Sequence, residues 1–133
     1  KQKTAYEIMP SLVGSEMCIR DRIISNTTIS RYSIDSSEAG GLSGQPIFDS
    51  STSMLNKVYK YTDGKIPLIG VGGIDSAEKA YKKIKNGASL IQLYTGLVYK
   101  GPKLITEINK GLIKFIEKDG FNNISEAVGV EVN

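Results

Sequence analysis

Residues 66–95 read IPLIGVGGIDSAEKAYKKIKNGASLIQLYT, and this stretch decides the fold class. Residues 66–71 form an apolar run, interrupted by Gly70, that is typical of a strand buried on both faces. A helical pattern follows, with an apolar stripe formed by Ala77, Ala80, Tyr81 and Ile84. Asn86 and Gly87 end this helix, and a second apolar run covers residues 88–93. The stretch therefore predicts a strand–helix–strand unit with parallel strands.

The other face of the predicted helix is rich in lysine. Asp75 or Ser76 offers the N-cap. We expect a solvated surface rather than a binding patch on this face, formed by Lys79, Lys82, Lys83 and Lys85.

The flanking sequence extends the same alternation. Residues 23–27 (IISNT) predict a strand, and residues 33–44 (SIDSSEAGGLSG) a polar, glycine-rich loop. A helix capped by Asp49, Ser50 or Ser51 is expected to end at Gly64, with an apolar face of Met54, Leu55, Val58 and Tyr61 or Thr62. After Gly101 and Pro102 a long helix is expected to end at Gly120, with an apolar face of Leu104, Ile105, Ile108, Leu112 and Ile116. A short helix is expected at residues 125–127, so the chain predicts three βα units of an α/β fold.

Composition excludes several classes of function. The 133 residues, 40% hydrophobic and 23% charged, suit one globular domain, and no apolar run reaches the roughly 18 residues of a membrane span. The net charge of +3 is spread along the chain, which gives no case for a nucleic-acid partner. With no histidine and a single cysteine, Cys18, the chain lacks the residues for Ser/His or Cys/His catalysis and for the usual metal sites.

Residues 1–22 (KQKTAYEIMPSLVGSEMCIRDR) show no sustained periodicity. KQKTAYEI and LVGSEMCIRDR resemble translations, in one frame, of sequencing-adapter DNA. We therefore expect residues 1–22 to be a disordered artefact, residues 23–133 to be the protein, and genomic DNA to carry unrelated codons upstream of Ile23.

Small polar residues and glycines follow each predicted strand. They are Ser25, Asn26, Thr27 and Thr28, then residues 70–73, then residues 92–95 with Gly96. Parallel strands bring these ends to one edge, where ligands bind. Paired glycines allow backbone N–H groups to approach a phosphate, and Asn26 with its threonines could orient a planar polar ligand. Each motif also has a simpler interpretation: a tight turn for the glycines, a strand-end cap for the NTT sequence, and a flexible loop for residues 40–44.

Taken together, the segments SNTTISR, EAGGLSGQPIFDSST, IPLIGVGGIDS, GASLIQLYTGLVYKGP and GFNNISEAVG resemble dihydroorotate dehydrogenases over residues 23–133. QLYTGLVYKGP and the GFNNISEAVG tail are similar to the membrane-associated, quinone-using class. The resemblance implies strands 6 to 8 of a TIM (β/α)₈ barrel, truncated at its start, and oxidation of dihydroorotate to orotate in pyrimidine (UMP) synthesis with FMN as cofactor and quinone as electron acceptor.

The resemblance also implies roles for individual residues. Asn26 and Thr27 would bind orotate, and Ser25 would lie against FMN. Gly44, Gly72 and Gly73 would approach FMN through their backbone. Tyr94 and Thr95 would hold its phosphate. Ala39 and Gln45 depart from the usual pattern, in which Thr precedes the glycines and Lys or Arg follows LSG.

In this family the serine that takes the proton, an FMN-contacting lysine, the quinone tunnel and the peripheral membrane segment lie upstream, without a match in residues 1–22. The resemblance thus implies no catalytic residue and no metal ligand here. We expect the 133-residue chain to be inactive alone. Two alternatives stay open: another phosphate-binding barrel enzyme, such as a lyase or isomerase, and a non-catalytic fragment that binds a partner.

Overall fold

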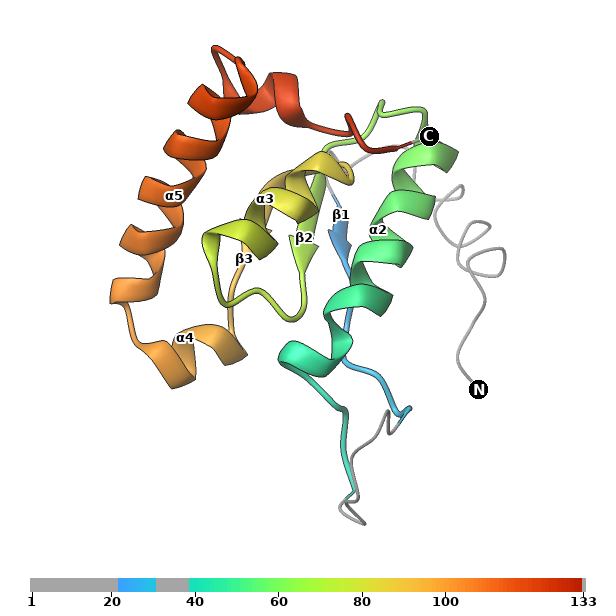
Figure 1. Ribbon diagram of the computed structural model, residues 1–133. Coiled ribbons are helices and arrows are strands. Elements are labelled where there is room, and N and C mark those ends of the chain that lie inside the picture. Colours follow the sequence, from blue (N-terminus) through green and yellow to red (C-terminus); the bar gives the residue numbers. More distant parts are fainter. Residues whose placement is uncertain (1–21, 31–38, 133) are drawn as a thin grey trace.

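The computed structural model describes residues 22–30 and 39–132, and its centre is a three-stranded sheet (Figure 1). The strands are β1 (Arg22–Ile24), β2 (Leu68–Val71) and β3 (Ala88–Gln92), all parallel and in that spatial order. Helix α2 (Phe48–Thr62) connects β1 to β2, and α3 (Ala77–Lys85) connects β2 to β3. Since parallel neighbours need such crossovers, the predicted succession of βα units is confirmed.

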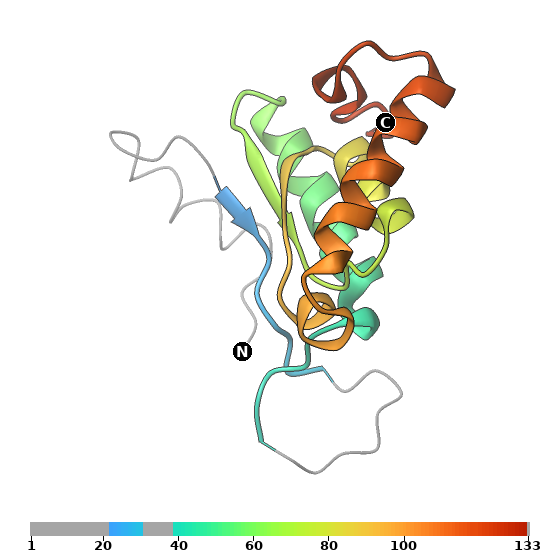
Figure 2. The same ribbon diagram turned by 90° about the vertical axis from the view of Figure 1, so that its left-hand side faces the viewer.

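The helices cover one face of the sheet. Figure 2 shows α2, α3 and α5 (Lys103–Asp119) on the same side of the three strands. The other face carries a row of apolar side chains in register, because Ile23 pairs with Ile69 and Ile69 pairs with Leu90. Ile23 is 58% exposed and Leu90 is 62% exposed. Residues 66–71 were expected to be buried on both faces, but in the described part of the chain nothing covers this row.

Three apolar clusters join the helices to the sheet. Between α2 and the strands lie Leu55, Val58, Leu68 and Ala88. A second cluster connects the start of α2 to α3 and α5 through Phe48, Ile74, Ala80, Leu104 and Ile108. In the third, the rings of Tyr81 and Phe115 stack with their centroids 5.3 Å apart, and the Tyr81 hydroxyl donates to Asp119 Oδ2 at 2.8 Å. Leu55, Leu68 and Ala88 have no exposed surface, so burial of these side chains is the main stabilising term.

Local polar contacts move several element boundaries. Strand β1 ends at Ile24 instead of residue 27, because the side-chain oxygen of Asn26 accepts the Thr27 N–H at 2.8 Å in place of a sheet carbonyl. Helix α2 begins at Phe48 after a 3₁₀ turn, η1 (Gln45–Ile47), and the expected caps are wrong. The Ser50 and Ser51 hydroxyls instead donate back to the carbonyls of Ile47 and Phe48.

The remaining helices follow the sequence more closely. Ser76 caps α3 by accepting the Lys79 N–H at 3.3 Å, and Gly120 ends α5 in the left-handed conformation. The short helix α4 (Thr95–Lys100) was not predicted, because its six residues are too few to show a period. It turns the chain from β3 into α5.

The C-terminal tail binds the end of α3. After the 3₁₀ turn η2 (Ile124–Ala127), the Gly129 N–H donates to the Ile84 carbonyl at 3.1 Å, and the Glu131 N–H donates to the Lys85 carbonyl at 2.9 Å. The Glu131 carboxylate pairs with Lys85 at 2.7 Å. These contacts supply partners to carbonyls that the helix end leaves free. In Figure 1 this tail lies at the top, while the loops that follow the strands lie at the bottom.

The predicted artefact at residues 1–22 lies outside the described residues except for Arg22, which is the first residue of β1. Part of the expected glycine-rich loop, residues 31–38, also lies outside them. None of the helices within the described ranges is long and apolar enough to cross a membrane.

The uncovered apolar row gives a prediction for the isolated 133-residue chain. Because Ile23 and Leu90 have no covering layer, we expect the purified chain to bind the dye 8-anilinonaphthalenesulfonate and to lose its circular-dichroism signal gradually on heating. A steep, cooperative melting curve without dye binding would instead favour a self-sufficient domain.

Candidate functional site

The carboxyl ends of the three strands open into one cleft of about 220 Å³. Its walls come from the segments after β1, β2 and β3 and from the loop that precedes η1. The cleft is lined by every residue to which the sequence analysis gave a binding role: Ser25, Asn26, Thr27, Gly44, Gly72, Gly73, Tyr94 and Thr95. We call it the strand-end cleft.

The wall after β1 presents small polar side chains. Asn26 and Thr27 are exposed toward the cleft, and the Asn26 side-chain oxygen is engaged by the Thr27 N–H. Among the described residues the Asn26 amide nitrogen has no hydrogen-bond partner, so it can donate to a ligand. Gly41 packs directly on the Thr27 side chain, because a Cβ at position 41 would overlap the threonine oxygen. This contact fixes Thr27 at the mouth of the cleft.

The wall after β2 is the Gly72–Gly73 turn. Gly73 has φ of 73°, and a Cβ there would lie 2.7 Å from the Phe48 Cα. Only glycine therefore fits between the strand end and the first turn of α2. The close packing holds this piece of backbone against α2 and leaves its other side to the cleft.

The wall after β3 is the start of α4. The N–H groups of Thr95 and Gly96 open the helix and have no intrahelical acceptor. The Thr95 hydroxyl lies 3.1 Å from the Ser43 hydroxyl, and Gly96 packs on the Ile74 carbonyl so closely that a Cβ would overlap its oxygen. Tyr94 is 78% exposed, so its backbone rather than its ring belongs to this wall. The wall is thus tied to both neighbouring loops.

A second cavity, of about 600 Å³, adjoins the strand-end cleft and shares its Gly44, Gly73 and Thr95 wall. It is larger, but it is lined by residues 39–46 and by the segments after β2 and β3, and none of the described residues 25–30, which follow β1, lines it. Only the smaller cleft touches all three strand ends, which is where ligands bind in parallel α/β folds. We therefore regard the strand-end cleft as the candidate site.

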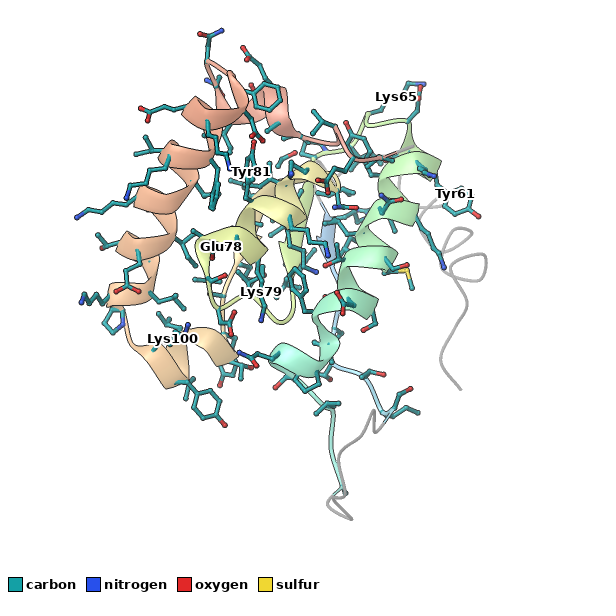
Figure 3. All side chains as sticks on the ribbon, viewed as in Figure 1. Tyr61, Lys65, Glu78, Lys79, Tyr81 and Lys100 are labelled. Atoms are coloured by element: carbon teal, nitrogen blue, oxygen red, sulfur yellow. The ribbon has the colours of Figure 1, made fainter. Side chains whose placement is uncertain are left out.

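Asp75 links the loops around the two cavities. Its carboxylate accepts a hydrogen bond from Gln45 and pairs with Lys79 at 2.9 Å, while the Lys100 ammonium donates to its backbone carbonyl at 2.8 Å. Figure 3 labels Lys79 on α3 and Lys100 on α4. Burial alone would raise the pKa of Asp75, but the contacts with Gln45 and Lys79 outweigh it and the pKa is lowered. Gln45, which departs from the pattern expected in the sequence analysis, thus contacts a carboxylate.

The expected solvated lysine face is wrong at Lys83. Lys83 lies one turn after Ala80 and borders the apolar stripe, so it points inward and has no exposed surface. Its ammonium nitrogen donates to the Ser51 hydroxyl at 2.6 Å and to the Val71 carbonyl at 3.2 Å. Burial lowers the pKa of Lys83 to about 7, although the charge of Asp49 acts in the opposite direction.

Sequence reasoning missed three contributors to the site, namely Ser43, the Gln45–Asp75 contact and the Lys83–Ser51 contact. Ser43 stands inside the glycine cluster of residues 40–44, so its place in the sequence was a usable signal. Nothing in the sequence signalled the burial of Lys83. Its position relative to Ala80 and Ile84 lies at the border of the apolar stripe, where a side chain can be either buried or exposed. Its burial depends on the packing of α3 against α2.

The donor set of the cleft suits an oxyanion. Backbone N–H groups, the Thr95 hydroxyl and the Asn26 amide can all donate hydrogen bonds, and phosphate groups bind at such helix starts. In residues 22–30 and 39–132, no group of three or more His, Cys, Asp or Glu residues is arranged to hold a metal ion. The chemistry available is hydrogen bonding to a phosphate and to a planar polar group.

Comparison with known proteins identifies relatives over most of the chain. The family model for dihydroorotate dehydrogenase matches residues 2–116, which include most of the segment predicted to be an artefact. The chain is 55% identical over 114 residues to the mitochondrial dihydroorotate dehydrogenase (quinone) of Arabidopsis thaliana, and 53% identical over 112 residues to the dihydroorotate dehydrogenase (quinone) of Nautilia profundicola. These alignments cover 82% and 83% of this chain but 25% and 31% of the relatives.

Solved structures agree with the sequence matches. The ligand-free dihydroorotate dehydrogenase of Eimeria tenella superposes with a TM-score of 0.86 at 33% identity, covering 96% of this chain and 36% of that one. The structure of the same protein in complex with ferulenol gives a TM-score of 0.85. The three parallel βα units are thus part of a (β/α)₈ barrel, as the fold prediction stated, and the chain spans about a quarter to a third of the curated relatives.

The buried Lys83 predicts how stability varies with pH. The pKa of Lys83 is near 7 in the folded state and about 10.4 in an unfolded chain. Between these values the unfolded state binds the extra proton, so the folded state gains stability as pH rises from 7 toward 10, by up to about 1.4 kcal/mol per pH unit. We expect the thermal midpoint of the full-length protein to rise with pH relative to that of Lys83→Met, whereas a Lys82→Met control keeps the wild-type trend.

Proposed function

Because this chain belongs to the dihydroorotate dehydrogenase family, we propose that it supplies the FMN-phosphate cradle and part of the orotate site of a quinone-dependent enzyme. The complete enzyme would oxidise dihydroorotate to orotate in pyrimidine (UMP) biosynthesis and pass the electrons to quinone. The observation that carries the proposal is the gathering of the SNTT, GVGG and LYTG segments around one strand-end cleft.

The phosphate cradle would be formed by the walls after β2 and β3. The N–H groups of Thr95 and Gly96 face outward from the start of α4, and the Thr95 hydroxyl stands beside them. A helix start attracts negative charge, and a glycine turn adds N–H groups on the opposite side. In (β/α)₈ barrels a phosphate site is often formed by the loops after strands 7 and 8 and the start of a short extra helix. These are the positions of Gly73 and α4.

The orotate contacts would come from the wall after β1. The free amide N–H groups of Asn26 can donate to a ring carbonyl or carboxylate, and the Thr27 hydroxyl can donate or accept. Gly41 and the neighbouring backbone hold Thr27 in place, so that these groups are oriented before a ligand arrives. Ser25 would lie against FMN at the base of the same wall.

FMN, when bound, would supply the acceptor for the hydride taken from dihydroorotate. The described residues bind and orient, and the proton acceptor, the quinone site and the peripheral membrane attachment are proposed to belong to the part of the relatives that this chain does not cover. The activity is therefore proposed for the complete barrel and not for these βα units alone.

Substitution of Thr95 tests whether its hydroxyl contributes to binding of the FMN phosphate. Thr95→Val keeps the side-chain shape and removes the hydroxyl, whose hydrogen bond to a charged phosphate contributes about 1.5–3 kcal/mol. In the full-length enzyme we expect Thr95→Val to weaken FMN binding roughly 10- to 100-fold, and Thr95→Ser to retain most of the affinity. Fluorescence titration of the apoenzyme with FMN measures this. Thr106→Val on the exposed side of α5 is the control, and equal affinity of Thr95→Val and wild type would contradict the role.

The isolated 133-residue chain tests whether these βα units bind FMN without the rest of the barrel. Because its cleft has walls from three strands only, we expect it to lose FMN during gel filtration. Flavin absorbance that co-elutes with the chain in a 1:1 ratio would show that these units bind the cofactor without the rest of the barrel.

A further inference from the structure

Lys83 forms an internal contact that lies directly beneath the Gly72–Gly73 turn. Its ammonium nitrogen bonds the Val71 carbonyl and the Ser51 hydroxyl, and Ser51 lies 3.2 Å from the Gly72 carbonyl. No acidic side chain in residues 22–30 and 39–132 forms an ion pair with Lys83. The hydrogen-bond partners of this buried amine are therefore the backbone of the turn and the serine that supports it, and the amine also lies 5.3 Å from the centre of the Phe48 ring.

The two bonded carbonyls determine where the neighbouring N–H groups point. In a trans peptide unit the carbonyl of one residue and the N–H of the next point in opposite directions. Lys83 holds the Val71 carbonyl toward α3. The Ser51 hydroxyl, whose single proton is shared between the Phe48 and Gly72 carbonyls, holds the Gly72 carbonyl toward α2. The N–H of Gly73 must then point away from these helices, toward the strand-end cleft that Gly73 lines. The orientation of a potential phosphate donor thus depends on a contact made behind the cleft.

The two glycines of the turn make the orientation of the Gly73 N–H depend strongly on these contacts. Gly72 and Gly73 have φ of 99° and 73°, and glycine alone populates such conformations freely. Two successive glycines without outside bonds would sample several peptide orientations, at an entropic cost to any conformer that binds a ligand. Ser51 also limits the turn from below, because a Cβ on Gly72 would lie 2.9 Å from its oxygen.

We propose that Lys83, acting with Ser51, is a positioning residue that orients the Gly72–Gly73 peptide groups for binding of the cofactor phosphate. It does not touch the cofactor. The inference rests on the proposed FMN site, and it adds two residues, one on α3 and one on α2, to the groups on which phosphate affinity depends.

A ligand pair separates this role from a purely structural one. FMN and riboflavin share the isoalloxazine ring and the ribityl chain, and only FMN carries the phosphate. A residue that orients the phosphate donors changes affinity for FMN and leaves affinity for riboflavin almost unchanged. A residue that merely supports the fold weakens both flavins alike.

The test uses the full-length apoenzyme titrated with each flavin by fluorescence. We expect Lys83→Met, and independently Ser51→Ala, to raise the dissociation constant for FMN by about tenfold or more, the loss of roughly one charge-assisted hydrogen bond, and that for riboflavin by less than about twofold. Lys82→Met and Ser50→Ala, which change exposed neighbours on the same helices, should leave both constants unchanged. Should Lys83→Met fail to fold, as circular dichroism would show, Ser51→Ala carries the test.

Two results would overturn the positioning role while leaving the proposed function intact: equal weakening of both flavins, or unchanged FMN affinity in folded variants. A wild-type apoenzyme that does not distinguish FMN from riboflavin would remove the phosphate site itself, and with it both proposals.

Discussion

Parallel pairing of the three strands is the constraint from which the site follows, although the pairing of β2 with β3 shifts register between Leu68 and Ile69. Because β1, β2 and β3 run in the same direction, Ile24, Gly70 and Ile91 stand side by side, and the segments after them emerge at one edge. These segments are far apart in the sequence. Strand pairing alone does not fix these segments, however, because they lie beyond the paired residues of the sheet. Hydrogen bonds between the loops hold these segments in place, among them the Ser43–Thr95 and Gln45–Asp75 contacts.

The sequence predicted those features that depend on local pattern. The long helices have strong apolar periodicity, so they could be found without coordinates. Most of the proposed binding residues stand immediately after apolar runs, so their gathering at one edge of the sheet could be predicted too. Features set by tertiary packing could not. Helix α4 is too short to show a period, and the serines expected to cap α2 turn back to carbonyls because η1 already precedes the helix. Lys83 was misassigned because a lysine in a lysine-rich helix is usually solvated.

The Lys83 amine is buried and forms no ion pair with a carboxylate in the part of the chain that the structure describes. Burying it costs free energy, and this cost explains its lowered pKa. Removing a charged group from water is unfavourable unless hydrogen bonds compensate, and burial shifts the pKa so that the neutral form becomes accessible. A neutral amine still donates two hydrogen bonds, which matches the two acceptors at Ser51 and Val71. An apolar side chain would fill the same space with less penalty. The presence of a polar group beneath the glycine turn is thus explained by the geometry of the turn and not by stability.

The clamp between the C-terminal tail and helix α3 lies at the opposite edge of the sheet from the strand-end cleft (Figure 1). Helix α3 therefore begins three residues after Ile74, which lines the strand-end cleft, and its last turn lies under the tail. For protein engineering this separation is useful. Surface redesign or grafting of a reporter module at the tail edge can alter how firmly α3 is held without introducing any atom near the strand-end cleft. In such barrels one rim varies with function while the other serves stability.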